Sequence, residues 1–278
     1  MSSRVFSVLF VVGCTVGARS QENPQHYLER AIIAHNQSYA TVEANSPRPL
    51  LQAITAVREE YGWIVEYEDP PYEGSVDLVK DSSISRTPEG LVFLIPAGGA
   101  FQSTYPETPD TRGSPDGELE VLGKIVSDYN ATKNPGKFVV RALQDGSYAL
   151  IGQSSENSDG KEVSVPPVLD TTISLPGATR SAAVTIKLIL VSLNKASSTK
   201  VGLGMVPINA FVQSQVTVGG SNVSAREFLV DVIDQIKAAK LIWELNFDPD
   251  GRVFYLNLLP ATQAHYNSSG KRTTTILR

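Results

Sequence analysis

Carboxylates and aromatic rings gather between residues 59 and 73, and these residue types could perform acid–base chemistry. The segment holds three aromatic side chains (Trp63, Tyr67 and Tyr72) and these acids: Glu59, Glu60, Glu66, Glu68, Asp69 and Glu73. A pair of carboxyl groups beside aromatic rings suits the cleavage of sugars. However, Glu66 and Glu68 alternate with Val65 and Tyr67, which is typical of the solvent face of a half-buried strand. We therefore expect solvent-facing carboxylates, and a carbohydrate-directed hydrolase using Trp63–Glu73 remains the alternative function.

Other residue types do not combine into a known catalytic pattern. The histidines are His26, His35 and His265, and none has a carboxylate at the spacing of a zinc site. Ser192 and Lys195 have the spacing of a Ser–Lys pair without its companion motifs, and no Gly-x-Ser-x-Gly elbow is present.

Two glycine-containing motifs are also incomplete. Gly202-Leu203-Gly204 lacks the third glycine of a dinucleotide loop. Asp248-x-Asp250-Gly251 begins like a calcium loop but has Leu259 where the twelfth-position glutamate would stand. We therefore assign no catalytic, cofactor-binding or metal-ligating residue and expect no cofactor.

The first twenty residues have the pattern of a secretory signal peptide. Arg4 precedes a short apolar run, and Ala18 and Ser20 provide small residues before a cleavage point after Ala18 or after Ser20. Val11-Val12-Gly13-Cys14 also resembles a bacterial lipobox, so a lipid anchor at Cys14 is the alternative. We expect an exported protein, either periplasmic or extracellular, with the soluble form favoured.

Composition limits the partners of the exported chain. Cys14 is the only cysteine, so removal of residues 1–20 leaves no disulfide and no thiol nucleophile. The same removal takes Arg4 and Arg19 from the 24 basic residues, which leaves a net charge of about −7 against 29 acids. An acidic chain without a Lys/Arg cluster repels nucleic acid, and no later stretch is apolar enough to span a membrane.

Hydrophobic spacing predicts an α+β fold in two related halves, each a small antiparallel sheet with helices packed on one face. The halves cover residues 21–153 and 168–260, and residues 261–278 are expected to be a disordered tail. Helices are predicted over 48–61, 119–129, 178–194 and 224–240, with a strand at 211–218. Hairpin turns are predicted at Asp145-Gly146 and at Asp248–Gly251.

Alternation also predicts how the last hairpin packs. Trp243, Leu245 and Phe247 share one face of the first strand, which should cover the helix through Phe228. Glu244 points the other way, and we expect it to be exposed.

The two halves show signs of an internal repeat. A shift of 179 residues places Leu50–Pro70 on Leu229–Pro249 without a gap, so that a helix, a strand and Asp-Pro recur in the same order.

The segment Val216–Leu259 resembles the short N-terminal domain of secretins and TonB-dependent receptors. It has the family's order of a strand, a small-residue turn at Gly219-Gly220, a helix and paired strands, and residues 42–68 repeat this order more loosely. The chain departs from the family because no plug, barrel or secretin core follows. The resemblance implies a periplasmic interaction module and assigns no catalytic residue. We therefore expect an exported, non-catalytic interaction module whose partner is a protein or a component of the cell envelope.

Overall fold

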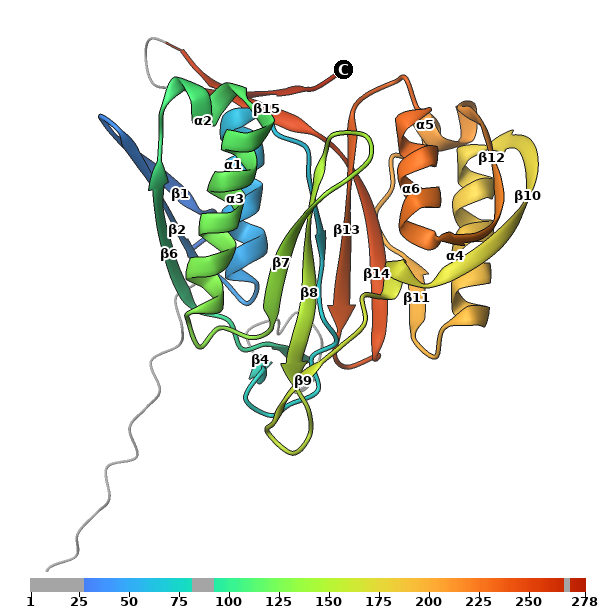
Figure 1. Cartoon of the computed structure of the whole chain (residues 1–278), viewed down its shortest axis with the longest axis horizontal. Coiled ribbons are helices and arrows are strands. Elements are labelled where there is room, and N and C mark those ends of the chain that lie inside the picture. Colours follow the sequence, from blue (N-terminus) through green and yellow to red (C-terminus); the bar gives the residue numbers. More distant parts are fainter. Residues whose placement is uncertain (1–27, 82–92, 268–270) are drawn as a thin grey trace, which may run out of the picture.

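A computed structural model describes residues 28–81, 93–267 and 271–278 of the chain. Layers of sheet and helix alternate across the molecule, with one large sheet in the middle (Figure 1). The predicted α+β class is confirmed. Strands from both predicted halves share one mixed sheet, so the main sheet of the described residues is not divided into a separate antiparallel sheet for each half, as was expected. The predicted signal peptide and Cys14 lie outside the described residues.

Strands from both halves of the chain form the central sheet. Within the described residues it has seven strands, in the order β11-β14-β13-β3-β8-β7 with β9 paired to β8. Their bounds are β3 Val65–Glu68, β7 Lys137–Ala142, β8 Tyr148–Glu156, β9 Glu162–Ser164, β11 Lys200–Leu203, β13 Leu241–Asp248 and β14 Val253–Pro260. β3 runs parallel to both of its neighbours, β8 and β13, at the centre of this sheet.

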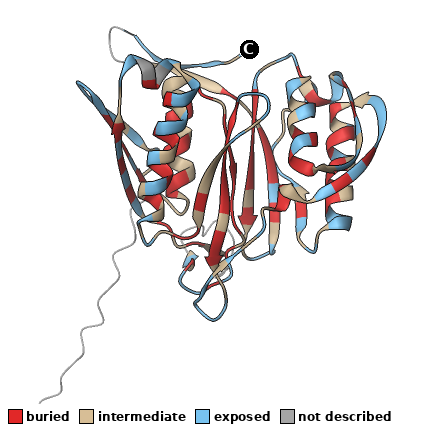
Figure 2. Ribbon diagram, viewed as in Figure 1, coloured by how far each residue is buried: buried red, intermediate tan, exposed pale blue. Residues whose placement is uncertain are grey.

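Helices cover both faces of the central sheet. α1 (Pro49–Tyr61) and α3 (Pro115–Asn130) lie on one face, and α4 (Ala182–Ala196) and α6 (Ala225–Asp234) lie on the other (Figure 1). Leu150 packs in the core with α1 and α3, whereas its neighbour Ile151 packs in the core with α4 and α6. The central strands are therefore buried on both sides, as the red ribbons of Figure 2 show.

Smaller elements flank these layers. β1, β2 and β6 form an outer sheet beside α1 and α3, and β10 pairs with β12 beside α4 and α6. The bounds are β1 Ile32–Asn36, β2 Tyr39–Asn45, β4 Leu78–Asp81, β5 Phe93–Pro96, β6 Ala100–Pro106, α2 Pro109–Gly113, η1 Val168–Asp170, β10 Thr172–Ser181, α5 Ile208–Gln213, β12 Gln215–Ser224, β15 Thr262–Tyr266 and β16 Arg272–Ile276.

Local signals placed several of these elements correctly. Pro49 begins α1, and Gly62 ends it in the left-handed conformation that favours glycine. Ser224 caps α6 in a capping box with Glu227, as the spacing predicts. The turn at Asp145-Gly146 joins β7 to β8, and the turn after Asp248 joins β13 to β14.

Other expected boundaries were wrong. Residues 178–181 end strand β10 rather than begin a helix, because Ser181 is the N-cap of α4 and pairs with Gln215. α6 ends at Asp234 rather than at residue 240. The strand expected at 211–218 starts at Gln215, since residues 208–213 form the short helix α5 with Pro207 as its N-cap. Residues 261–278, expected to be disordered, contain the paired strands β15 and β16.

Candidate functional site

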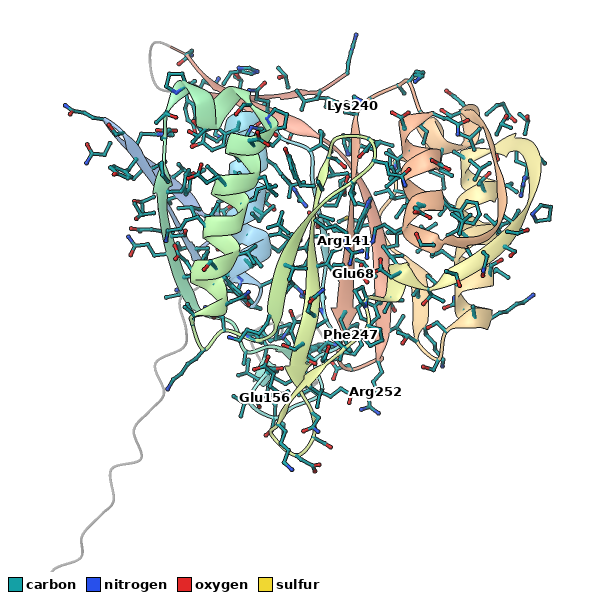
Figure 3. All side chains as sticks on the ribbon, viewed as in Figure 1. Glu68, Arg141, Glu156, Lys240, Phe247 and Arg252 are labelled. Carbon is teal, nitrogen blue, oxygen red and sulfur yellow. The ribbon has the colours of Figure 1, made fainter. Side chains whose placement is uncertain are left out.

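Glu66 and Glu68, which sequence alternation placed in solvent, are buried instead, and so is the adjacent Asp69. Glu66, Glu68 and Asp69 are 3%, 0% and 2% exposed. The expectation was wrong because α6 packs over the second face of β3 and β13 pairs alongside β3 in the sheet, which alternation alone cannot reveal. Figure 3 places Glu68 at the centre of the molecule, between the two helical layers.

Asp69 ties the end of β3 to the end of β13. Its Oδ2 accepts hydrogen bonds from the Arg48 Nε at 2.7 Å and from the Phe247 backbone N–H at 2.9 Å. Its Oδ1 accepts from the hydroxyls of Tyr67 at 2.8 Å and Tyr72 at 3.0 Å. These four donors satisfy the carboxylate fully, so that Asp69 has no lone pair left for chemistry.

Glu68 ties β3 to α6 through Arg226. The Arg226 Nη2 donates to Glu68 at 2.6 Å, and its Nε donates to Asp170 at 2.9 Å. Arg141 also donates to Asp170, at 2.9 Å. Burial lowers the pKa of Arg226, but the charges of Glu68 and Asp170 outweigh burial and raise it, so this guanidinium stays charged.

Glu66 ties β3 to β13, and no cation of the described residues is bonded to it. Its Oε2 accepts the backbone N–H of Trp243, while the nearby Arg58 donates instead to Glu244 and to the Val65 carbonyl. Burial raises the pKa of Glu66 well above its ordinary value, although the Trp243 N–H and the charge of Arg58 oppose this shift.

We expect Glu66→Gln to stabilise the protein at neutral pH. The native state of the wild type holds the Glu66 proton more tightly than the unfolded state does, so its stability falls as pH rises above the ordinary glutamate pKa. Glutamine keeps an acceptor for the Trp243 N–H but has no charge to bury. Thermal unfolding should show a higher Tm for the variant at pH 7 and a much smaller difference at pH 4. A Tm difference independent of pH would contradict this account.

The acid–aromatic cluster therefore joins β3 to β13 and α6 rather than forming a cleft. Its buried acids bond to β13, α6 and neighbouring tyrosines, and its outer acids pair at the surface: Glu59 with Arg272, Glu60 with His35 and Glu73 with Arg252. A general acid and a general base need access to a substrate. Glu66, Glu68 and Asp69 lack this access.

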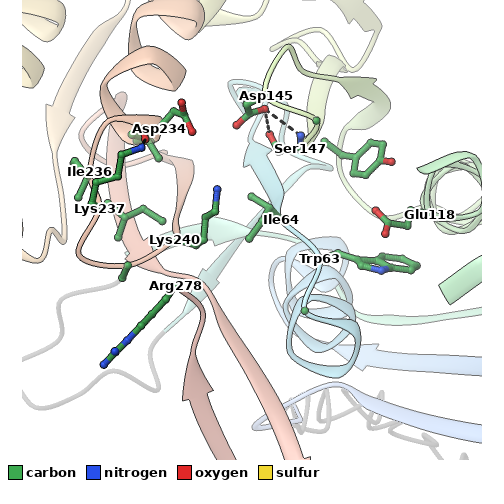
Figure 4. Close-up of a pocket in the computed structure, with 16 residues that line it drawn as sticks. Trp63, Ile64, Glu118, Asp145, Ser147, Asp234, Ile236, Lys237, Lys240 and Arg278 are labelled. Carbon is green, nitrogen blue, oxygen red and sulfur yellow. Dashed lines mark hydrogen bonds between the residues drawn. The ribbon is translucent and has the colours of Figure 1, made fainter. Parts of the chain in front are cut away.

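A pocket of about 380 Å³ lies where β3 and β13 diverge (Figure 4). Its acids are Glu118, Asp145 and Asp234, and its bases are Lys237, Lys240 and Arg278. Asp145 accepts hydrogen bonds from the backbone N–H of Ser147 at 3.0 Å and from its hydroxyl at 2.7 Å. Because the charges balance, this pocket does not favour a ligand of one sign.

The neighbouring surface of α6 is acidic. A second pocket, of about 400 Å³, is lined by Glu227, Asp231 and Asp234 of this helix together with Asp145. Burial raises the pKa of Asp231, and the charges of Glu227 and Asp234 raise it further. Acids three and four residues apart on a helix repel one another, so this surface favours no anionic partner.

One long stretch of the C-terminal part of the chain has no acid. Residues 171–226 contain no Asp or Glu, although the whole chain has 29. α4, β11 and α5 belong to this stretch, and α4 contacts both of the others. Their solvent-exposed cations are Lys187, Lys195 and Lys200. Exposed apolar side chains stand among them: Val184, Val191, Leu203, Met205, Ile208 and Val212. We call these nine side chains the acid-free face.

The sequence analysis did not predict this face, although the sequence contains the feature that defines it. This feature is the absence of Asp and Glu over a long stretch. A search for Lys/Arg clusters does not detect it, because the lysines are far apart in the sequence.

The incomplete motifs have structural explanations. A Cβ on Gly204 would stand 2.2 Å from the Asn257 side chain, so close packing accounts for this glycine. The Asp250 backbone N–H donates to Asp248 at 3.1 Å inside the hairpin turn. Ser192 and Lys195 lie near the end of α4, where Lys195 is exposed.

The two histidines among the described residues, His35 and His265, belong to different hairpins. His35 contacts Glu107 at 2.9 Å and Glu60 at 3.3 Å on the surface, an arrangement that local spacing could not predict. His265 lies beside Thr275 in the β15–β16 hairpin, and His26 lies outside the described residues. In the part of the chain that the structure describes, no group of three or more His, Cys, Asp or Glu side chains is arranged to hold a metal ion.

Comparison with known proteins gave no match: no family model, no curated protein and no solved structure resembles this chain significantly. Among the described residues, no helix combines the length and the apolar character needed to cross a membrane.

Proposed function

We propose that this protein is an exported, non-catalytic interaction module that docks on an anionic phospholipid surface through its acid-free face. The observation that carries this proposal is the acid-free stretch 171–226, which gives an acidic protein one face bearing lysines without counter-charges.

Charge would orient the molecule on such a surface. The rest of the protein is negative and is repelled by anionic lipid, so only the face with Lys187, Lys195 and Lys200 can approach. Each lysine near an anionic membrane contributes about 1 kcal/mol.

Apolar side chains on the same face supply a second term. Met205, which follows β11, and Ile208, at the start of α5, are 64% and 62% exposed, and both β11 and α5 contact α4. Exposed apolar groups among cations are typical of proteins that lie on a membrane surface, where inserted methylenes add to the charge attraction. The same side chains gain no such free energy of burial while they remain exposed to water.

Two other features agree with this proposal. The strand–helix–strand–strand order of β12, α6, β13 and β14 is the one that the resemblance to secretin and TonB-receptor domains implies. The competing hydrolase would need free carboxylates between Trp63 and Glu73. Glu66, Glu68 and Asp69 are instead buried, and they form hydrogen bonds to β13 and α6.

Vesicle sedimentation tests the proposal. The protein should bind vesicles of mixed neutral and anionic phospholipid, and binding should weaken as salt screens the charges. Replacing Lys187, Lys195 and Lys200 together by glutamine should lower partitioning roughly a hundredfold, since three lysines contribute about 3 kcal/mol.

A matched control uses three exposed lysines outside the acid-free face. Glutamine at Lys80, Lys133 and Lys161 changes the net charge equally and should leave binding almost unchanged. Equal losses in the two triple variants would overturn the proposal. Binding to polyglutamate without binding to vesicles would also overturn it and would indicate an acidic protein partner instead.

A further inference from the structure

The central sheet is built from two groups of strands with the same pairing. In one group, β3 runs parallel to β8, which pairs antiparallel with β7. In the other group, β11 runs parallel to β14, which pairs antiparallel with β13. Each group therefore has a leading strand (β3 or β11) at one edge and the first strand of a hairpin (β7 or β13) at the other.

These groups join edge to edge in a head-to-tail manner. The hairpin strand β13 of one group pairs in parallel with the leading strand β3 of the other, and the Asp69 N–H donates to the Leu245 carbonyl at 2.9 Å. This contact joins a hairpin-strand edge (β13) to a leading-strand edge (β3). One hairpin-strand edge, β7, and one leading-strand edge, β11, therefore remain at the two ends of the sheet. A contact of this kind that does not close can be repeated from copy to copy.

Both remaining edges carry the same obstacle. At β7, the Asn130 side chain accepts from the Phe138 N–H at 3.0 Å and donates to the Phe138 carbonyl at 2.8 Å. At β11, the Asn194 side chain accepts from the Val201 N–H at 2.7 Å and donates to the Val201 carbonyl at 2.8 Å. Asn130 ends α3, and Asn194 lies in the last turn of α4.

An asparagine side chain can imitate a neighbouring strand in this position. Its amide offers one acceptor and its own donors, which match the N–H and C=O that a strand residue presents at an open edge. Open edges with such free groups are templates for pairing with other chains, and proteins commonly block them.

We infer that β7 and β11 are complementary docking edges for a second copy of this chain, and that Asn130 and Asn194 keep both edges closed. Copies would pair β7 of one with β11 of the next, as β13 pairs with β3 within the chain. This inference does not rest on the proposed membrane function.

Two single variants and their mixture test it by sedimentation velocity. Asn130→Ala opens only β7 and Asn194→Ala opens only β11, so each variant alone should remain a monomer. An equimolar mixture should form a 1:1 dimer with twice the monomer mass and nothing larger. The double variant should form concentration-dependent assemblies beyond the dimer.

Asn157→Ala serves as the control, because Asn157 also accepts two backbone hydrogen bonds, from Asp159 and Lys161, but in a surface turn. It should remain a monomer alone and in mixtures. A monomeric mixture of folded single variants, with near-ultraviolet circular dichroism like the wild type, would overturn the inference. So would self-association of either single variant alone.

Hydrogen exchange of the wild type measures directly whether the two strand edges are blocked, and it does not require the variants to fold. The amides of Phe138 and Val201 should exchange more slowly than that of Val140, which faces the same side of β7 as Phe138 does but is not bonded to Asn130. Exchange of Phe138 and Val201 as fast as that of Val140 would mean that the edges are open, and would overturn it.

Discussion

Replacing Arg226 by alanine should lower the free energy of unfolding by about 3–5 kcal/mol, because the change leaves a buried carboxylate without its cation. Glu68 is 0% exposed, and Arg226 is its only bonded charge partner in the described residues. Burial raises the pKa of Glu68, and loss of Arg226 removes the strongest opposing influence. The variant should therefore recover part of the lost stability at acidic pH, where Glu68 can take up a proton.

Arg141→Ala is the matched comparison for this experiment. Arg141 bonds to the same Asp170, but its side chain is 41% exposed, so its loss should cost no more than about 1 kcal/mol. Urea titrations of both variants measure the difference. Equal losses would mean that Glu68 does not depend on Arg226.

Trp243→Ala should lower the free energy of unfolding by about 3–5 kcal/mol through the cavity that it leaves. Trp243 is 0% exposed and packs in the core that contains Phe228 and Val232 of α6. The Arg226 guanidinium also lies 5.3 Å from the centre of its ring, so the substitution removes an attraction between cation and ring as well.

Glu244→Ala probes the other face of the same strand. The sequence-based expectation that Glu244 is exposed was wrong: it is 8% exposed and pairs with the buried Arg58 of α1. Its loss leaves Arg58 without a carboxylate, so we expect a cost of about 2 kcal/mol. A denaturant titration in which Glu244→Ala matches the wild type would contradict this pairing.

Local patterns predicted the elements whose causes are local. The cap at Ser224, the proline at Pro49 and the turn at Asp145-Gly146 act within a few residues, and all three hold. Alternation also placed Trp243 on the core face of β13, with Phe247 opposite Phe254.

The same alternation failed at β3, for a reason that lies far away in the chain. It correctly put Glu66 and Glu68 on one face, but it could not tell that α6 packs over that face or that β13 pairs alongside β3. Arg226 and Trp243, which bond to Glu68 and Glu66, are more than 150 residues away in the sequence, so no local pattern predicts these contacts.

Surfaces were predicted less well than elements, because a surface gathers residues from separate segments. Counting charged clusters left the acid-free stretch 171–226 unnoticed, although a count of acids alone reveals it. The sequence does not predict the contacts of Asn130 and Asn194 with the strand edges, because these contacts depend on how each helix end packs beside a strand.

Docking of the acid-free face on lipid can be measured at a single residue. An environment-sensitive fluorophore is attached at Val191→Cys, on the acid-free face, in a chain whose only cysteine has been replaced by Cys14→Ser. A second chain carries it at Leu119→Cys, on exposed α3 in the other half. The account predicts a blue shift of emission on anionic vesicles for the label at Val191 and none for the label at Leu119. No shift at Val191, or equal shifts at both sites, would contradict it.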